Sequence, residues 1–340
     1  MDNKAVWLNG PGTVPFVGPA PVPEPGEGQL LVRVKAVAVQ PGEWKIQAGI
    51  IPIPLKYPTI IGISLSGVVE KVGPGVTRFG PGDRIASNST GVLRNDAQFG
   101  AYQRFALVPQ ALTSKISETP FEDAASLATA YGPMSALFLH LGLERPSGRT
   151  EAAKRDEKVL IWGVSSSFGA FAAQIAKIAG YTVVGTASGG HAELAKTVGV
   201  AHFADRDAPS VVEDVAALGP FKAVLGAADS ADDQVKIGEI LAAQGGGHFL
   251  STMGVRPGVK LPNGVTGSFQ QFLDDYLEPG KKEFTEWVWW SFLENAFAAN
   301  SLKTIPLEVK GGLSKVVEAW GLLQQGKVSG KRLIILPHLD

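Results

Sequence analysis

The sequence contains no cysteine, which excludes disulfide bonds, thiolate metal sites and a cysteine nucleophile. It has five histidines, at His140, His191, His202, His248 and His338. None of them shows the spacing of metal ligands, and no serine lies in a nucleophile-elbow motif. We therefore expect a site without a metal, and hydrolase chemistry has no support. The lack of cysteine also agrees with a reducing cytosol.

An excess of charge of one sign is also missing. The 340 residues carry 31 Lys and Arg against 32 Asp and Glu, a net charge of -1, so no broad field favours nucleic acid or an anionic membrane. No stretch reaches about 18 uninterrupted apolar residues, and no basic segment followed by an apolar run opens the chain. We expect a soluble, cytoplasmic protein that binds neither nucleic acid nor a membrane.

The first third of the sequence has the pattern of short strands. Up to about residue 108, β-branched runs alternate with proline and glycine. The predicted strands are 29–39, 67–72, 84–86 and 102–108. Such spacing is typical of a small antiparallel barrel or sandwich.

Farther along, strands and helices alternate. The predicted elements are strands at 158–162, 182–186, 221–227 and 248–252 and helices at 168–179 and 192–198. This alternation indicates a parallel sheet with helices on both faces, and therefore an α/β fold. The last stretch, 307–336, predicts a strand, a helix and a final strand. The length of the chain suits two domains.

The most informative segment is the turn that follows strand 158–162. Gly163 turns the chain and a helix begins soon after it, which leaves backbone N–H groups and the positive end of the helix facing one point. That arrangement suits a pyrophosphate, with hydroxyl donors from Ser165, Ser166 and Ser167. Because Ser165 replaces the second glycine of G-x-G-x-x-G, the prediction depends on the strand and helix around the loop. An ordinary turn with serines capping the helix is the alternative.

The end of the next strand indicates which nicotinamide cofactor binds. An NAD site would place an acid there for the ribose hydroxyls, but the sequence reads Thr186-Ala187-Ser188-Gly189-Gly190-His191. Ser188, His191 and, farther on, Arg206 could donate hydrogen bonds to the extra phosphate of NADP. We therefore expect NADPH. The alternative for His191 is a surface residue at the start of a helix.

Several motifs resemble one known family over nearly the whole chain. They are GVVEKVGPGVTRFGPGDRI at 67–85, PGEWKIQ at 41–47, YPTIIG at 57–62, GGHFLS at 246–251 and GKVSGKRLIIL at 326–336. The sequence resembles the zinc-independent branch of the medium-chain dehydrogenase/reductase superfamily. Within it, the chain is most similar to fungal quinone-reductase-like proteins and to stand-alone, trans-acting enoyl reductases that work beside a polyketide synthase.

The resemblance implies the domain organisation and the quaternary state. A GroES-like β-barrel domain would comprise residues 1–128 and 300–340, and a doubly wound Rossmann domain, with its parallel sheet, would comprise residues 129–299. The active site would lie in the cleft between them, and monomers or homodimers are both found. The zinc ligands of metal-dependent relatives are replaced here by Gln40 and by Ile63-Ser64. The resemblance therefore implies no metal.

The resemblance also implies the cofactor contacts. Besides the Gly163 turn, these are Gly42, Glu43, Trp44, Lys45, Ser165, Ser166, Ser167, Phe168, Ser188, Gly189, Gly190, His191, Arg206, Ser329 and Gly330. The sequence departs from the family at Arg206, where relatives commonly have tyrosine, and at Ser64, where relatives usually have aspartate. The second departure leaves the polarity of the active site open.

Reduction of a conjugated double bond needs hydride at the β-carbon, a hydrogen-bond donor at the carbonyl oxygen and a proton for the α-carbon. By resemblance, Lys45 is the leading donor, with a structural or cofactor-holding lysine as the alternative. Tyr57 and Thr129 are further catalytic candidates, with packing or turn structure as their alternatives, and solvent is another proton source. Trp287 and Trp290, on a predicted helix at 286–295, are candidates for a pocket that binds an apolar, polyketide-like substrate. Core packing or a subunit contact is their alternative.

The sequence thus predicts an NADPH-dependent, zinc-independent reductase of activated C=C bonds in an enone, a quinone or an enoyl thioester, with a place in secondary metabolism. Two other functions remain open. One is an NADPH-binding redox sensor without turnover. The other is a biosynthetic enzyme that uses the same scaffold for a non-redox cyclisation.

Overall fold

The computed structural model describes residues 2–146, 153–272, 276 and 278–340. The chain forms two compact units, one of Met1–Thr129 with Tyr276–Asp340 and the other of Ala130–Asp275. This division differs from the predicted boundaries because residues 276–299 belong to the first unit. The aromatic helix in this segment packs on that unit, where Trp290 Nε1 donates to the carbonyl oxygen of Gln110 at 3.1 Å.

The first unit is built mainly from antiparallel strands. Its larger sheet has seven strands in the order β14-β15-β3-β4-β5-β7, with β6 paired to β3, and β1 and β2 form a separate hairpin. The strands are β1 (Asn3–Trp7), β2 (Phe16–Ala20), β3 (Gln29–Ala38), β4 (Ser64–Val72), β5 (Arg84–Asn88), β6 (Phe105–Pro109), β7 (Thr113–Lys115), β14 (Leu307–Gly311) and β15 (Arg332–Ile335). The helices are α1 (Pro41–Gln47), α2 (Gly91–Arg94), α3 (Phe121–Leu127), α9 (Lys282–Trp287), α10 (Glu294–Ala299) and α11 (Val316–Gln324).

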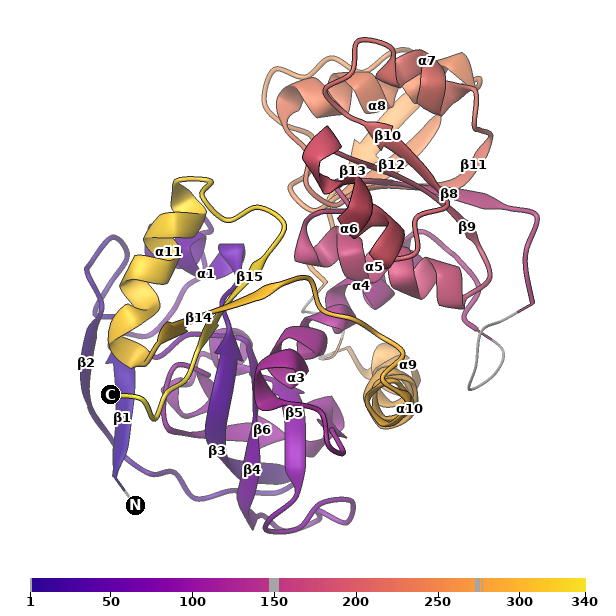
Figure 1. Ribbon diagram of the computed structural model, residues 1–340. Coiled ribbons are helices and arrows are strands. Elements are labelled where there is room, and N and C mark those ends of the chain that lie inside the picture. The colour runs from indigo at the N-terminus through magenta and orange to yellow at the C-terminus, as the bar shows by residue number, and fades with distance from the viewer. Residues whose placement is uncertain (1, 147–152, 273–275, 277) are drawn as a thin grey trace. The chain divides into compact units, whose positions relative to one another are not determined.

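Both ends of the chain contribute to this unit. Strand β15 pairs antiparallel with β3, with Ile334 opposite Ala38, so the C-terminal segment closes the sheet beside the strand that leads into α1. Figure 1 shows the yellow β14, α11 and β15 next to the indigo β3 and α1. The interior between the strands and α11 is filled by apolar side chains such as Val34, Leu65 and Trp320.

The second unit contains a six-stranded parallel sheet in the order β10-β9-β8-β11-β12-β13. The strands are β8 (Lys158–Trp162), β9 (Thr182–Ala187), β10 (His202–Asp205), β11 (Phe221–Gly226), β12 (Gly247–Ser251) and β13 (Val265–Ser268). The helices are α4 (Tyr131–Ser135), α5 (Ser167–Ile178), α6 (Ala192–Thr197), α7 (Val211–Ala216) and α8 (Ala231–Ala243). Helices α5 and α6 cover one face and α7 and α8 the other (Figure 1), and the sheet is a doubly wound Rossmann fold.

The predicted α/β fold, an antiparallel GroES-like domain with a Rossmann-type sheet, is confirmed. The sequence analysis did not predict strands β1, β2 and β7 of the first unit or β10 and β13 of the second. Among the helices in the described ranges, none is both long enough and apolar enough to cross a bilayer.

Candidate functional site

The turn after β8 requires a glycine. Gly163 adopts φ +93°, and a Cβ at this position would lie 2.8 Å from both the Cβ and the carbonyl oxygen of Ala228. The amides of Gly163 and Val164 each donate to the carbonyl oxygen of Thr186 at 2.9 Å, which fixes the turn to the end of β9. The turn lies where the strand order reverses between β8 and β11, the position at which open α/β sheets bind ligands.

Ser166 caps the helix that follows the turn. Its Oγ accepts from the amide of Gly169 at 3.0 Å and donates to the carbonyl oxygen of Gly163 at 2.8 Å. A hydroxyl has one hydrogen, so the structure corrects the role of phosphate donor expected for this side chain. The amides of Ser167 and Phe168, the first two residues of α5, have no acceptor within the helix and lie at its positive end. These two amides are the groups that suit an anion.

Close backbone packing keeps the start of α5 next to the turn. A Cβ at Gly169 would lie 2.3 Å from the carbonyl oxygen of Gly163, so any side chain there would push the helix away. Ser165 completes the turn, and the ring of Phe168 packs on that of Phe272 with centroids 5.2 Å apart. A tight turn that begins at a glycine and leads into free helix amides fits the pyrophosphate of a nicotinamide dinucleotide.

The other predicted cofactor residues of this unit lie at the same edge of the sheet. Ser188, Gly189, Gly190 and His191 follow β9, the last three in a 3-10 turn. Arg206 follows β10, and its amide donates to the carbonyl oxygen of Ala187, the last residue of β9, at 2.9 Å. Because β10, β9 and β8 are neighbours, the structure brings these residues and the β8 turn together along one edge.

This edge also carries an acid, Asp205, which does not follow β9 in the sequence. Asp205 ends β10, and a Cβ at Gly189 would lie 2.5 Å from its Oδ2, so the carboxylate lies against the predicted phosphate segment. Its Oδ1 accepts from the amide of Asp207 at 3.0 Å. A carboxylate here can accept from ribose hydroxyls and repels a phosphate.

In the first unit, Gly42, Glu43, Trp44 and Lys45 lie on α1. The Glu43 side chain is fully buried. Its Oε2 accepts from the amide of Gln40 at 2.9 Å and from the Tyr102 hydroxyl, and its Oε1 accepts from the amide of Ile63 at 3.2 Å. The structure therefore corrects the cofactor contact expected for this side chain, because the carboxyl group points into the barrel and caps α1.

Burial raises the pKa of Glu43 to about 7, against the lowering effect of the hydrogen bonds from Gln40, Tyr102 and Ile63. A pKa that is higher in the folded state adds stability below its unfolded value of 4.5, and this stability is lost as the pH rises to about 7. As the pH rises from 4.5 to about 7, we expect the free energy of unfolding of the wild-type protein to fall by about 3 kcal/mol relative to that of Glu43→Gln. Urea unfolding of both proteins from pH 4.5 to 8 measures the difference. Parallel pH profiles would contradict a protonated Glu43.

The positions of zinc ligands in metal-dependent relatives hold a neutral chain of hydrogen bonds. Gln40 Nε2 donates to Ser64 Oγ at 2.8 Å, and Ser64 Oγ donates to Asn88 Oδ1 at 2.6 Å. These amide and hydroxyl groups satisfy one another and carry no charge, so they do not make the anionic or imidazole donor set that Zn²⁺ prefers. Within the described ranges, no three His, Cys, Asp or Glu side chains gather as a metal site would need.

Lys45 and Tyr57 are both partly exposed. The Nζ atom of Lys45 lies 5.9 Å from the ring centroid of Trp44, the residue before it. Tyr57 packs against the apolar interior of the barrel. Burial raises the pKa of Tyr57, so its hydroxyl stays protonated at neutral pH and can donate a hydrogen bond.

Thr129 and the predicted C-terminal contacts belong to the same unit. Thr129 Oγ1 donates to the carbonyl oxygen of Ser126 at 2.7 Å and accepts from Arg332 Nη2 at 3.3 Å. Its only hydrogen is thus in use, and it can offer a ligand an acceptor but no donor. Ser329 and Gly330 precede β15, whose pairing with β3 brings their segment to the start of α1.

The two predicted pocket tryptophans have packing roles. Trp290 donates to Gln110, and the guanidinium of Arg78 lies 4.9 Å from its ring centroid. These contacts hold the half-buried side chain on the barrel, and its place in a substrate pocket stays a prediction. Trp287 packs between two neighbours on its own helical segment, with ring centroids 5.7 Å from Phe284 and 5.6 Å from Phe292.

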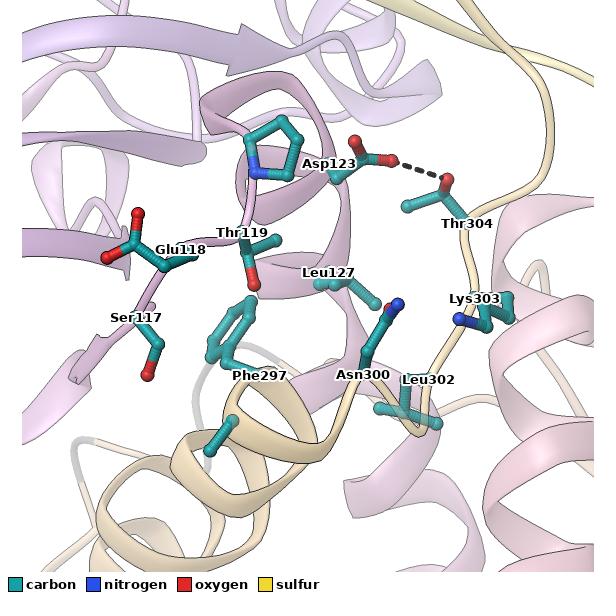
Figure 2. A pocket seen from close by; sticks show the side chains of 12 residues that line it. Ser117, Glu118, Thr119, Asp123, Leu127, Phe297, Asn300, Leu302, Lys303 and Thr304 are labelled. Carbon is teal, nitrogen blue, oxygen red and sulfur yellow. Dashed lines mark hydrogen bonds between the residues drawn. The ribbon is translucent and has the colours of Figure 1, made fainter.

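A separate pocket of about 590 Å³ lies in the first unit. Figure 2 shows its apolar side chains, Leu127, Phe297 and Leu302, and the hydrogen bond of 3.0 Å from Thr304 to Asp123. None of the predicted catalytic, cofactor or substrate residues lines it. The pocket therefore belongs to the packing between α3 and α10 and not to the candidate site.

Comparisons with known proteins agree with this architecture. Residues 26–118 match the alcohol dehydrogenase GroES-like domain. The trans-enoyl reductase himH of Aspergillus japonicus is 33% identical over 98% of this chain and 97% of its own length. The dehydrogenase azaJ of Aspergillus niger is 30% identical over 98% of both chains. A Pseudomonas syringae pv. Tomato DC3000 quinone oxidoreductase of known structure has a TM-score of 0.76 at 22% identity, covering 99% of this chain and 100% of its own.

The identity to himH extends over both units and therefore includes the barrel, the turn after β8 and the returning C-terminal strands. The solved structure supports the fold alone. Together with the GroES-like match, these similarities establish that the chain belongs to the medium-chain dehydrogenase/reductase superfamily of nicotinamide-dependent oxidoreductases.

Proposed function

We propose that this protein reduces activated C=C bonds with NADPH, without a metal. The observation that carries the proposal is the turn from β8 into α5, where Gly163 and Gly169 bring backbone against backbone and leave two helix amides for a pyrophosphate. Relatives whose names include trans-enoyl reductase support the choice of a C=C bond.

The donor set of the barrel favours this reaction over zinc-assisted alcohol oxidation. A zinc alcohol dehydrogenase needs ligands that hold a Lewis acid at the substrate oxygen. Here Gln40 and Ser64 bond to each other and to Asn88 instead. Reduction of an enone or enoyl thioester needs no metal at the carbonyl oxygen, because uncharged or ammonium side chains can donate hydrogen bonds to it.

The bound nicotinamide would supply hydride, and the residues of the chain would orient the reactants and handle the proton. The Lys45 ammonium would donate to the carbonyl oxygen as negative charge develops there, and would deliver a proton for the α-carbon or pass one from solvent. Tyr57 would be a second donor. Thr129, whose hydrogen is held by Ser126, would accept from the carboxamide of the nicotinamide.

The preference for NADPH is part of the proposal and gives a prediction about charge. We expect Ser188→Asp to weaken NADPH binding about tenfold or more and to leave NADH binding much less affected, because a new carboxylate repels the 2′-phosphate. Asp205→Asn, which removes the carboxylate beside Gly189, should shift the ratio of the two affinities in the opposite direction. Nucleotide fluorescence titration measures both. If neither substitution changed the ratio, this edge would not hold the 2′-phosphate.

The substrate would be an apolar or polyketide-like acyl group, and the protein would act beside a polyketide synthase. Support for this part comes from the relative himH, which is named a trans-enoyl reductase and matches nearly the whole chain.

A screen of acceptors tests the proposed function. Purified protein is mixed with NADPH and, in turn, a quinone, a simple enone and a short enoyl thioester, and loss of absorbance at the wavelength of NADPH is followed. We expect turnover with the enoyl thioester. Binding of NADPH without oxidation by any acceptor would contradict a reductase and favour a sensor or a non-redox enzyme.

A further inference from the structure

Arg332 is a buried cation in contact with the segments that carry the candidate residues of the barrel unit. It is 7% exposed. Its Nη1 donates to the carbonyl oxygen of Val39 at 2.9 Å, and its Nη2 donates to Thr129 Oγ1 at 3.3 Å. Val39 precedes the cap of α1, the helix with Lys45. Arg332 itself lies two positions after Gly330 and three after Ser329, both predicted cofactor residues.

The guanidinium remains charged in this environment. Burial lowers the pKa of Arg332 to about 10, while electrostatic attraction to Glu43 and Tyr102 opposes the shift. At neutral pH the barrel therefore encloses a positive charge near the buried carboxyl group that caps α1. Enclosing a cation is costly unless its hydrogen bonds and its counter-charge are well placed.

A purely structural role explains this arrangement poorly. In the part of the chain that the structure describes, Nε of Arg332 has no hydrogen-bond partner. Its two hydrogen bonds reach neutral oxygens, one of them a side-chain hydroxyl 3.3 Å away, and Glu43, with a pKa of about 7, supplies only part of a counter-charge at neutral pH. An apolar side chain would fill the same space without the free energy needed to bury a charge. The hydrogen bonds of Arg332 to Val39 and Thr129 therefore need a reason other than stability.

We infer that Arg332 is a positioning residue of the proposed reduction, which holds Thr129 as a hydrogen-bond acceptor for the nicotinamide carboxamide and fixes the start of the helix that carries Lys45. The hydroxyl of Thr129 is held on both sides. Ser126 takes its hydrogen and Arg332 donates to one lone pair, which leaves the other lone pair for an N–H donor. Without Arg332, the hydroxyl loses one of the two contacts that orient it.

The inference rests on the proposed function, since it needs a nicotinamide ring for Thr129 to meet. It also predicts selectivity among ligands. Loss of the Arg332 contact should affect binding of the nicotinamide end of the dinucleotide and spare the adenosine and phosphate end. A general loosening of the barrel makes no such distinction.

The test uses variants in which the buried charges are removed together. Arg332→Met alone leaves Glu43 without its counter-charge and is expected to impair folding, so it is built on Glu43→Gln, which serves as the background. Thr129→Val is added separately and in combination. Circular dichroism verifies the fold, and titration gives the Kd of NADPH and of 2′-phospho-ADP-ribose, which lacks nicotinamide, for each full-length protein.

We expect Arg332→Met in the Glu43→Gln background to raise the Kd of NADPH about tenfold, the size of one well-oriented hydrogen bond. Thr129→Val in the same background should raise the Kd of NADPH by a similar factor. The variant with both substitutions should have the same Kd as either alone, because both remove one contact. 2′-phospho-ADP-ribose should bind all variants with equal affinity. Unchanged NADPH affinity, multiplied effects or equal losses for the fragment would each overturn the inference. If the wild-type protein bound neither nucleotide, the proposed function itself would fail.

Discussion

Replacement of Gly169 by alanine is expected to weaken NADPH binding about 100-fold or more. The new Cβ would lie 2.3 Å from the carbonyl oxygen of Gly163, a backbone atom that cannot rotate away, so the start of α5 must move off the turn. That movement separates the amides of Ser167 and Phe168 from the bound phosphates. Each hydrogen bond to a charged group contributes roughly 1.5–3 kcal/mol, and loss of two gives the stated factor.

A matched glycine in another helix provides the control. Gly321 lies within α11, and a Cβ there would meet nothing within 4 Å. Gly321→Ala should leave NADPH affinity unchanged and raise the free energy of unfolding by about 0.5–1 kcal/mol, as alanine is the better helix former. Titration with NADPH measures the affinity of each variant, and thermal unfolding measures its stability. Wild-type affinity in folded Gly169→Ala would show that the dinucleotide does not bind on this turn.

Most of the fold could be predicted because its strands and helices follow simple periodicities. Two of the missed strands, β10 and β13, show where that signal fails. Strand β10 has four partly or fully exposed residues, His202–Asp205, and its pattern is too short to stand out. Strand β13 contains Gly267, which usually weakens a strand. In the structure that glycine is required, because a Cβ there would lie 2.7 Å from the ring of Phe249.

The candidate site was predictable where its residues are contiguous and unpredictable where distant segments meet. The turn at Gly163 and the residues after β9 could be found because strand, turn and helix follow one another. The burial of Glu43 depends on Tyr102, 59 positions away, and the orientation of Thr129 depends on Arg332, 203 positions away. No local pattern contains such contacts.

The same limit explains why the edge beside Ser188 was counted as free of acids. The residues that follow β9 contain no acid, but a parallel sheet places the end of the next strand beside them. Asp205 reaches Gly189 from β10, and the absence of a side chain at Gly189 is what makes room for its carboxylate. Cofactor preference is therefore a property of two strand ends and cannot be derived from one.

Replacement of Lys45 by alanine is expected to lower kcat by roughly 100-fold to 10,000-fold, the usual contribution of a positioned general acid. The ammonium group would otherwise stabilise charge on the substrate oxygen and supply a proton, and alanine can do neither. Lys45 lies on α1, whose start is fixed by the buried Glu43 cap, so removal of its side chain should leave the barrel folded. Steady-state kinetics with an enoyl thioester measure the loss.

Two measurements separate catalysis from cofactor binding, the other role that Lys45 can have. If the lysine acts on the substrate, kcat should fall while the Kd of NADPH changes less than about threefold, whereas a residue that only holds the cofactor changes Kd and spares kcat. Lys56→Ala, at an exposed lysine of the same unit, controls for loss of a positive charge and should match the wild-type protein. Full kcat in Lys45→Ala would assign the proton to solvent or Tyr57. In that case the rate would depend on how the reactants are oriented. Substitutions of Thr129 and Arg332, which we propose orient the nicotinamide, would then lower the rate of reduction more than any change at Lys45.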